Sequence, residues 1–121
     1  MRRWSAASRL VALTAADFDR VVFRADLTPV LVEFAAPGCR PCREMEAELE
    51  ELARELDGEA IIATVNVDDE PGLADAAQVS VVPTLVIFVG GAVEDVLVGR
   101  QSKATLRQKL VAGPRPVLAT A

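Results

Sequence analysis

The sequence predicts an α/β fold in which a mixed sheet of five strands is flanked by four helices. Short apolar runs alternate with segments that carry apolar residues at helical spacing, which is typical of strands joined by helices. Two of these runs are apolar almost throughout, which suits central strands covered on both faces. Near the C-terminus, Gly90 and Gly91 separate two apolar runs and predict a hairpin that closes the sheet.

The N-terminal third predicts a strand, a helix and a second strand. The first strand covers residues 9–13. Thr14 follows as the expected N-cap of a helix, with Asp17 in the place of a capping-box glutamate. The apolar face of this helix consists of Phe18, Val21, Val22 and Ala25. The second strand covers residues 30–34, and Glu33 is the polar residue that interrupts it.

The clearest helix of the sequence follows the two cysteines, Cys39 and Cys42. Its apolar stripe consists of Met45, Leu49, Leu52 and Leu56. Pro41 suits the first turn, where a missing N–H costs nothing, and Gly58 suits the end of the helix. We therefore expect Cys39 just before the helix and Cys42 within its first turn.

The C-terminal half continues the alternation of strands and helices. We expect a buried strand over residues 60–68, a short helix opened by Pro71, and a strand over residues 83–89. A returning strand follows at residues 93–99, and Ser102 caps the last helix. The predicted apolar face of that helix consists of Leu106, Leu110 and Val111.

Length and composition predict one soluble domain over residues 1–121. The chain has 121 residues and is 51% hydrophobic, which suffices for a core without disulfide staples. We expect an ordered core at about residues 9–112 and a frayed tail at residues 113–121. The net charge of -5 argues against a nucleic-acid partner, and no stretch is long enough to span a bilayer. We expect a monomer.

The N-terminal segment partly imitates a secretion signal. Arg2 and Arg3 precede an apolar run, but Ser5, Ser8 and Arg9 interrupt that run and leave it too short. We therefore expect no export segment and a cytoplasmic location, where thiols are kept reduced.

Three kinds of role are open to two cysteines separated by two residues. A structural zinc site needs four ligands, and the chain has two cysteines and no histidine, so only a metal shared between two chains would remain. A structural disulfide across so short a loop removes little chain entropy and does not persist in a reducing compartment. We therefore expect no metal site and favour thiol–disulfide exchange.

The position of the two cysteines suits a reactive thiolate. The attacking species in disulfide exchange is a thiolate, and the unpaired N–H groups and the dipole at a helix N-terminus favour an anion. Arg40 and Arg43 add positive charge nearby. Cys39, at the exposed end, is placed to attack, and Cys42, one turn inward, is placed to resolve the mixed disulfide.

Four segments then point to a known family. In chain order they read VEFAAPGCRPC, VNVDDEP, VVPTLVIF and VGRQSKATLRQKL. Together they resemble the thioredoxin family from about residue 10 to residue 111. The resemblance implies the thioredoxin fold, with a central five-stranded mixed β-sheet flanked by four helices. It also implies a redox-active disulfide between Cys39 and Cys42, with no bound cofactor.

The resemblance assigns roles to single residues. Cys39 matches the attacking cysteine and Cys42 the buried resolving one. Pro83 matches a cis-proline that faces the disulfide, so that the backbone of Val82 can pair with an extended substrate strand. Gly99 matches a glycine that flanks the same groove. The expected substrate-binding residues are therefore Gly38, Arg40, Pro41, Val82, Pro83 and Gly99.

Glu33 is the third expected catalytic residue. The family places an aspartate at this position, buried behind the resolving cysteine. A buried carboxyl group has a raised pKa and can accept the proton of Cys42. The alternative is that Glu33 points to water from an exposed face. The family's usual lysine opposite this acid corresponds to Thr64 here, which leaves Glu33 easier to protonate.

Other positions depart from the usual family pattern. Gly38 replaces a tryptophan, Ala35 another aromatic residue, and Arg40 a glycine, so the recognition surface is barer and more positive. Ala47 replaces a proline that kinks the helix. Because Arg40 stabilises the thiolate and thus the reduced form, we expect a somewhat more oxidising couple than that of a typical thioredoxin.

The expected function is reduction of protein disulfides by dithiol–disulfide exchange. The resemblance implies disulfide-containing protein substrates and recycling by an NADPH-dependent thioredoxin reductase. Two alternatives stay open at this point. One is a binding or chaperone module with little redox turnover, and the other is an oxidase-like or isomerase-like variant.

Overall fold

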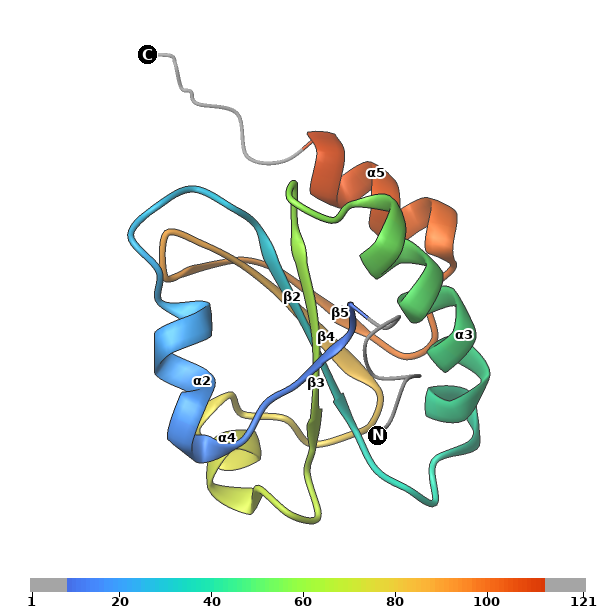
Figure 1. Cartoon of the computed structure of the whole chain (residues 1–121). Helices are drawn as coiled ribbons and strands as arrows, with labels where there is room; N and C mark the ends of the chain where they lie inside the picture. Colours follow the sequence, from blue (N-terminus) through green and yellow to red (C-terminus); the bar gives the residue numbers. More distant parts are fainter. Residues whose placement is uncertain (1–8, 113–121) are drawn as a thin grey trace, which may run out of the picture.

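A computed structural model describes residues 9–112, and its elements follow the predicted order (Figure 1). The strands are β1 (Val11–Ala12), β2 (Val30–Ala35), β3 (Ile61–Asn66), β4 (Thr84–Val89) and β5 (Ala92–Val98). The helices are α2 (Ala15–Val22), α3 (Arg40–Glu55), α4 (Pro71–Ala76) and α5 (Lys103–Ala112). The predictions made for residues 1–8 and 113–121 lie outside the described residues.

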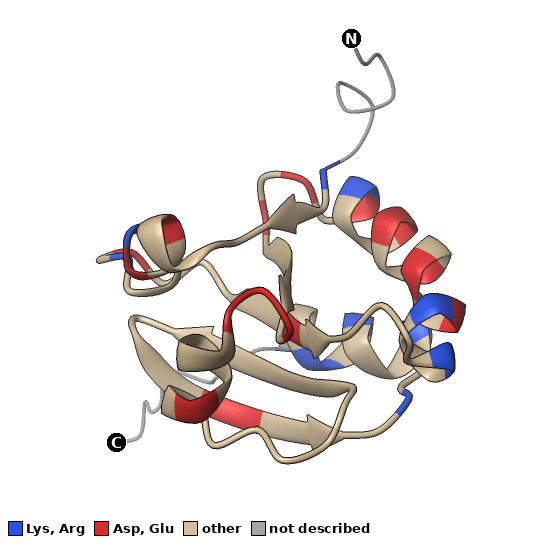
Figure 2. Cartoon of the chain, turned by 90° about the horizontal axis from the view of Figure 1, so that it is seen from below, with Lys and Arg blue, Asp and Glu red and all other residues tan. Residues whose placement is uncertain are grey.

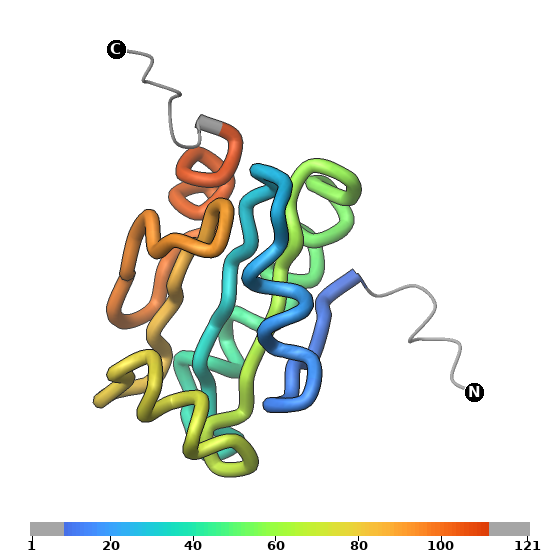
Figure 3. Tube along the Cα trace, turned by 90° about the vertical axis from the view of Figure 1, so that its left-hand side faces the viewer, coloured from blue at the N-terminus to red at the C-terminus, as the bar shows by residue number. Residues whose placement is uncertain are grey.

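The five strands form one mixed sheet in the order β1-β3-β2-β4-β5. The pairs β1–β3 and β2–β3 are parallel, whereas β2–β4 and β4–β5 are antiparallel. Figure 3 shows β1, in blue, and β5, in orange, at opposite edges of the sheet. The most apolar strands, β2 and β4, both lie in the interior of the sheet. This is expected, because an interior strand is covered on both faces.

The helices cover the two faces of the sheet as separate layers. In Figure 1, α2 and α4 lie on one side of the strands and α3 and α5 on the other. Alternate residues of β2 contribute to different cores, as the two-residue period of a strand requires. Leu31 packs with the stripe of α3, whereas Val30, Val32 and Phe34 pack with α2. The predicted stripe of α3 is confirmed, and its members are Met45, Leu49, Leu52 and Leu56.

Helix α2 begins as the sequence predicts but ends earlier than predicted. The Asp17 carboxylate accepts the N–H of Thr14 at 2.7 Å, as predicted for the start of α2. Ala25, predicted on the apolar face, is exposed and lies beyond α2. After the helix, Asp26 binds Arg24 at 2.8 Å and accepts the N–H of Thr28 at 3.0 Å, and these contacts hold the bend that carries Ala25.

A second core prediction is wrong in α5. Leu106 and Leu110 are buried, but Val111 is 54% exposed. Leu106 and Leu110 are four positions apart and share one face, whereas Val111 is one position farther round the helix. Only the first two therefore reach the core beneath α5.

Candidate functional site

Strand register brings three segments that are distant in sequence to one end of the sheet. Phe34, near the end of β2, pairs with Thr84 at the start of β4, and Thr84 pairs with Val98 at the end of β5. The loop after β2 leads to the cysteines, Pro83 precedes β4, and Gly99 follows β5. The N–H of Gly99 donates to the Pro83 carbonyl at 2.8 Å, which joins two sides of the site directly.

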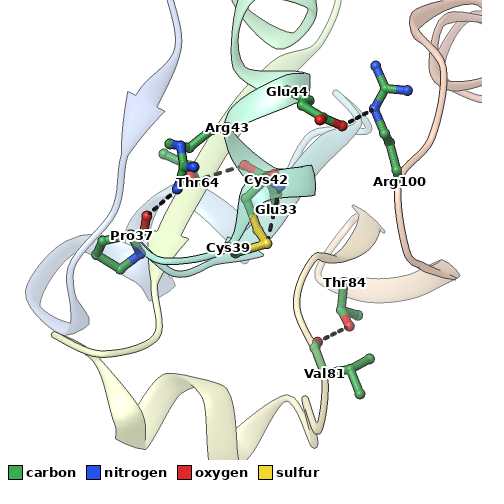
Figure 4. Close-up of a disulfide and its surroundings, with 10 residues drawn as sticks. All are labelled: Glu33, Pro37, Cys39, Cys42, Arg43, Glu44, Thr64, Val81, Thr84 and Arg100. Carbon is green, nitrogen blue, oxygen red and sulfur yellow. Dashed lines mark hydrogen bonds and ion pairs between the residues drawn. A yellow bond between two sulfur atoms is a disulfide. The ribbon is translucent and has the colours of Figure 1, made fainter.

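Cys39 and Cys42 form a disulfide at the start of α3, with their Cα atoms 5.3 Å apart (Figure 4). Cys39 is the N-cap of α3, and its Sγ accepts the N–H of Cys42 at 3.1 Å. Cys39 is half-buried, whereas Cys42 is 5% exposed. The first sulfur is thus open to a partner and lies where the helix N-terminus favours negative charge, and the second is enclosed.

The loop before β4 lies among the surroundings of the disulfide. Figure 4 places its flanking residues Val81 and Thr84 on one side of the sulfurs. The peptide bond between Val82 and Pro83 is cis, as expected. The Thr84 hydroxyl donates to the Val81 carbonyl at 2.7 Å and holds the loop to the strand. Pro83 is buried and Val82 half-buried, so Val82 is the more accessible of the two.

Glu33 lies beneath α3, because it shares a face of β2 with Leu31. Glu33 is 4% exposed, which rules out an exposed position. Its Oε1 accepts the Thr64 hydroxyl at 3.4 Å, and its Oε2 has no hydrogen-bond partner within residues 9–112. The carboxyl group also lines an open cavity of about 510 Å³, together with Cys42 and Glu46.

The surroundings of Glu33 favour its protonated form. Burial raises the pKa of its carboxyl group from 4.5 to about 7, and the negative charge of Glu46 adds to that rise. The hydrogen bond from Thr64 acts in the opposite direction on the pKa. The predicted direction of the pKa is therefore confirmed, and Thr64 does face the acid. A group with a pKa near 7 can take up and release a proton near neutral pH.

The arginines near the sulfurs form ion pairs and a hydrogen bond that the sequence analysis did not predict. Arg40, between the cysteines, is 82% exposed and binds Glu44 at 3.3 Å. The same Glu44 carboxylate binds Arg100 at 3.6 Å, and Arg43 donates to the Pro37 carbonyl at 2.9 Å. Arg100 and Glu44 were not among the predicted site residues. The spacing of Arg40 and Glu44 is a signal that could have found one of these pairs, since residues four apart share a helix face.

The remaining predicted positions line the same end of the molecule. Gly38 and Pro41 are exposed, and a side chain added at Gly38 would meet nothing within 4 Å. Gly99 has a φ of +90°, which favours glycine on conformational grounds alone. Helix α3 runs through Ala47 without interruption. The structure thus brings all predicted catalytic and substrate-binding residues to one end of the sheet.

Residues 9–112 contain no group of three or more histidine, cysteine, aspartate or glutamate side chains arranged to hold a metal ion. Within the same residues, every helix is too short or too polar to cross a membrane.

Comparison with known proteins finds similarity to thioredoxins over most of the chain. The family model described as Thioredoxin matches residues 9–112. Thioredoxin 1 of Nostoc sp. is 38% identical over 103 residues, which cover 85% of this chain and 95% of that protein. The chloroplastic M-type thioredoxin of Zea mays is 36% identical over 102 residues, covering 84% of this chain and 60% of that protein. The thioredoxin of Pyropia yezoensis is 37% identical over 98 residues, covering 81% of this chain and 91% of that protein.

Proposed function

The chain belongs to the thioredoxin family and is a thiol–disulfide oxidoreductase, and on this premise we propose that it reduces disulfides of other proteins, with Cys39 as the attacking and Cys42 as the resolving residue. The observation that carries the assignment of roles is the unequal exposure of the two sulfurs. Cys39 is half-buried at the N-terminus of α3, and Cys42 is 5% exposed one turn inward. Only the first is open to a bulky substrate.

The proposed reaction starts from the reduced dithiol. The Cys39 thiolate attacks one sulfur of the substrate disulfide, so that a Cys39–substrate disulfide forms and the substrate S–S bond breaks. The released substrate thiolate takes up a proton. The Cys42 thiol then loses its proton, and its sulfur attacks Cys39 Sγ and expels the second substrate thiolate, which is protonated in turn. Two electrons and two protons pass to the substrate, and the Cys39–Cys42 disulfide remains.

We assign to Glu33 the proton transfer of the second step. Its carboxylate would accept the proton of Cys42 through the cavity that both residues line. Support comes from its pKa of about 7, which leaves a useful fraction of carboxylate at neutral pH. The cavity that both residues line is large enough to hold water, which would carry the proton where the two groups are not in direct contact.

The proposed substrate site is the groove around the sulfurs. An extended substrate segment would pair with the backbone of Val82, while Gly38, Pro41 and Gly99 leave space for it. The resulting disulfide needs a reductant, and we propose an NADPH-dependent thioredoxin reductase as that partner. The chain itself would need no bound cofactor. We further propose that it acts as a single-domain monomer in the cytoplasm.

The test is insulin reduction in the presence of dithiothreitol, followed as turbidity. The native chain should accelerate precipitation, and Cys39→Ser should abolish the acceleration. Cys42→Ser should instead accumulate a mixed disulfide with the substrate through Cys39, visible by mass spectrometry and reversed by excess thiol. Equal rates for the native chain and Cys39→Ser would reject the proposal in favour of a binding module.

A second measurement addresses the direction of electron flow. Titration of the Cys39–Cys42 couple against glutathione should give a potential that lets the dithiol reduce protein disulfides. A potential far above the poise of the cytosol would instead identify an oxidase or isomerase.

A further inference from the structure

Two arginines border the proposed groove from different parts of the chain. Arg40 lies between the two cysteines, and its side chain is 82% exposed. Arg100 follows Gly99, whose N–H binds the Pro83 carbonyl, and its side chain is 51% exposed. Arg40 is therefore held near the sulfurs by its position between the two cysteines, and the register of β4 and β5 brings Arg100 to the same end of the sheet.

The two arginines share one counter-ion. Glu44 forms ion pairs with Arg40 at 3.3 Å and with Arg100 at 3.6 Å, and Figure 4 shows the Arg100 side chain reaching toward Glu44 beside the disulfide. One carboxylate cannot neutralise two guanidinium groups, so this trio keeps a net positive charge. All three side chains are at least 46% exposed, so a partner can reach them without displacing the core.

This positive charge is local. The chain as a whole has a formal net charge of -5. Figure 2 views the molecule from the end at which α3 begins, and it shows basic residues at the start of α3 and acidic residues on the loop between β3 and α4. That loop carries Asp68, Asp69 and Glu70. Asp69 and Glu70 of that loop line the cavity beside Cys42, so an acidic protein is repelled on that side of the disulfide. It is attracted on the side of Arg40 and Arg100, which orients its approach.

We infer that Arg40 and Arg100, balanced by Glu44, select protein substrates whose disulfide is flanked by acidic side chains. The inference rests on the proposed disulfide-reductase function and names the class of substrate that this site prefers. A carboxylate next to the substrate sulfurs competes with Glu44 for the two guanidinium groups. A basic side chain at the same place meets only repulsion from them.

The test uses three synthetic disulfide peptides that differ only in the residues beside the disulfide. The flanking residues are aspartate, serine or lysine. The second-order rate constant of each peptide with the reduced chain is measured by stopped-flow at low salt. We expect the aspartate peptide to react about threefold to tenfold faster than the lysine peptide at low salt. In 1 M salt, where the screening length is about 3 Å, we expect the ratio to fall to the value that the intrinsic reactivities of the two peptides set.

Variants of the charged trio give changes of opposite sign. Arg100→Gln should lower the aspartate-to-lysine ratio about twofold to threefold, because one attractive charge is lost. Glu44→Gln should raise the ratio, because it frees both guanidinium groups. Arg107→Gln is the matched control, since Arg107 of α5 is an exposed arginine bound to Glu55 at the far end of α3 from the cysteines, and the ratio should not change. Comparing ratios across variants cancels the intrinsic reactivity of each peptide.

The outcomes separate this inference from the function on which it rests. Loss of reaction with the serine peptide would overturn the reductase function itself. Reaction with all three peptides at one ratio in the native chain, Arg100→Gln and Glu44→Gln would leave the function intact and overturn the inference. A lower ratio in Glu44→Gln would also overturn it, and partial unfolding cannot mimic the expected rise.

Discussion

Replacing Glu33 with glutamine should change how the stability of the protein depends on pH. In the folded chain, burial and the charge of Glu46 raise the pKa of Glu33 from 4.5 to about 7. The folded state therefore holds this proton more tightly than the unfolded state does. Stability from this group is fully present below pH 4.5, is lost as pH rises toward 7, and stays lost above that value. Glu33→Gln removes this dependence.

The size of the effect follows from the pKa. Each pKa unit corresponds to about 1.4 kcal/mol, so the rise from 4.5 to about 7 costs the native chain about 3 kcal/mol at pH 9. Because Glu33 is 4% exposed, solvent screens little of this cost. The glutamine side chain keeps the bond from Thr64 only through its oxygen. Its buried NH₂ group adds a cost that is the same at every pH.

The assay is urea unfolding of the disulfide form of both chains at pH 4 and pH 9. The stability of Glu33→Gln relative to the native chain should rise by about 3 kcal/mol between these two pH values. Glu59→Gln, at an exposed glutamate, is the control and should show no such change. A difference between Glu33→Gln and the native chain that stays constant from pH 4 to pH 9 would refute the buried, proton-binding role of Glu33.

Three further predictions concern the fold. Leu49→Ala, at a residue 1% exposed in the core beneath α3, should lower the free energy of unfolding by about 2–5 kcal/mol in urea titrations, and a loss under about 1 kcal/mol would contradict its place in that core. Gly72→Ala in α4 should stabilise the chain by about 0.5–1 kcal/mol. Gly99→Ala, at a φ of +90°, should instead destabilise it by about 1–2 kcal/mol. Thermal unfolding that gives the same sign for both substitutions would contradict this reasoning. Glu55→Gln removes the ion pairs to Lys103 and Arg107 and should lower the urea midpoint only slightly. This difference from the native chain should vanish in 1 M salt, because salt screens exposed charges, and a difference that persists there would contradict a role by charge.

Local patterns in the sequence were sufficient for the order of elements and for the chemistry of the site. Apolar periodicity, together with Pro71 and the Gly90-Gly91 pair, predicted the order of strands and helices in the described chain. Each apolar pattern reports which face of a segment must leave water. The position of Cys39 before α3 followed from Pro41 and from the helix stripe. Glu33 stood out because a charged residue in an apolar strand needs a particular environment.

Local sequence patterns did not predict where some elements end or which apolar side chains are exposed. Ala25 and Val111 looked like core residues, yet one lies beyond the end of α2 and the other points away from the sheet. Whether an apolar residue is buried depends on what packs opposite it. That partner comes from another part of the chain and leaves no mark at the residue itself.

By itself, the sequence determined that this protein is an α/β domain with a reactive dithiol at a helix start, since these features depend on neighbours close in the chain. Only the tertiary structure decided that Gly99 binds Pro83, that one Glu33 oxygen has no partner among residues 9–112, and that Arg40 and Arg100 share Glu44. The physical reason is register: hydrogen bonding between β2, β3, β4 and β5 sets which distant residues meet, and with them the charges and the proton acceptor around the two sulfurs.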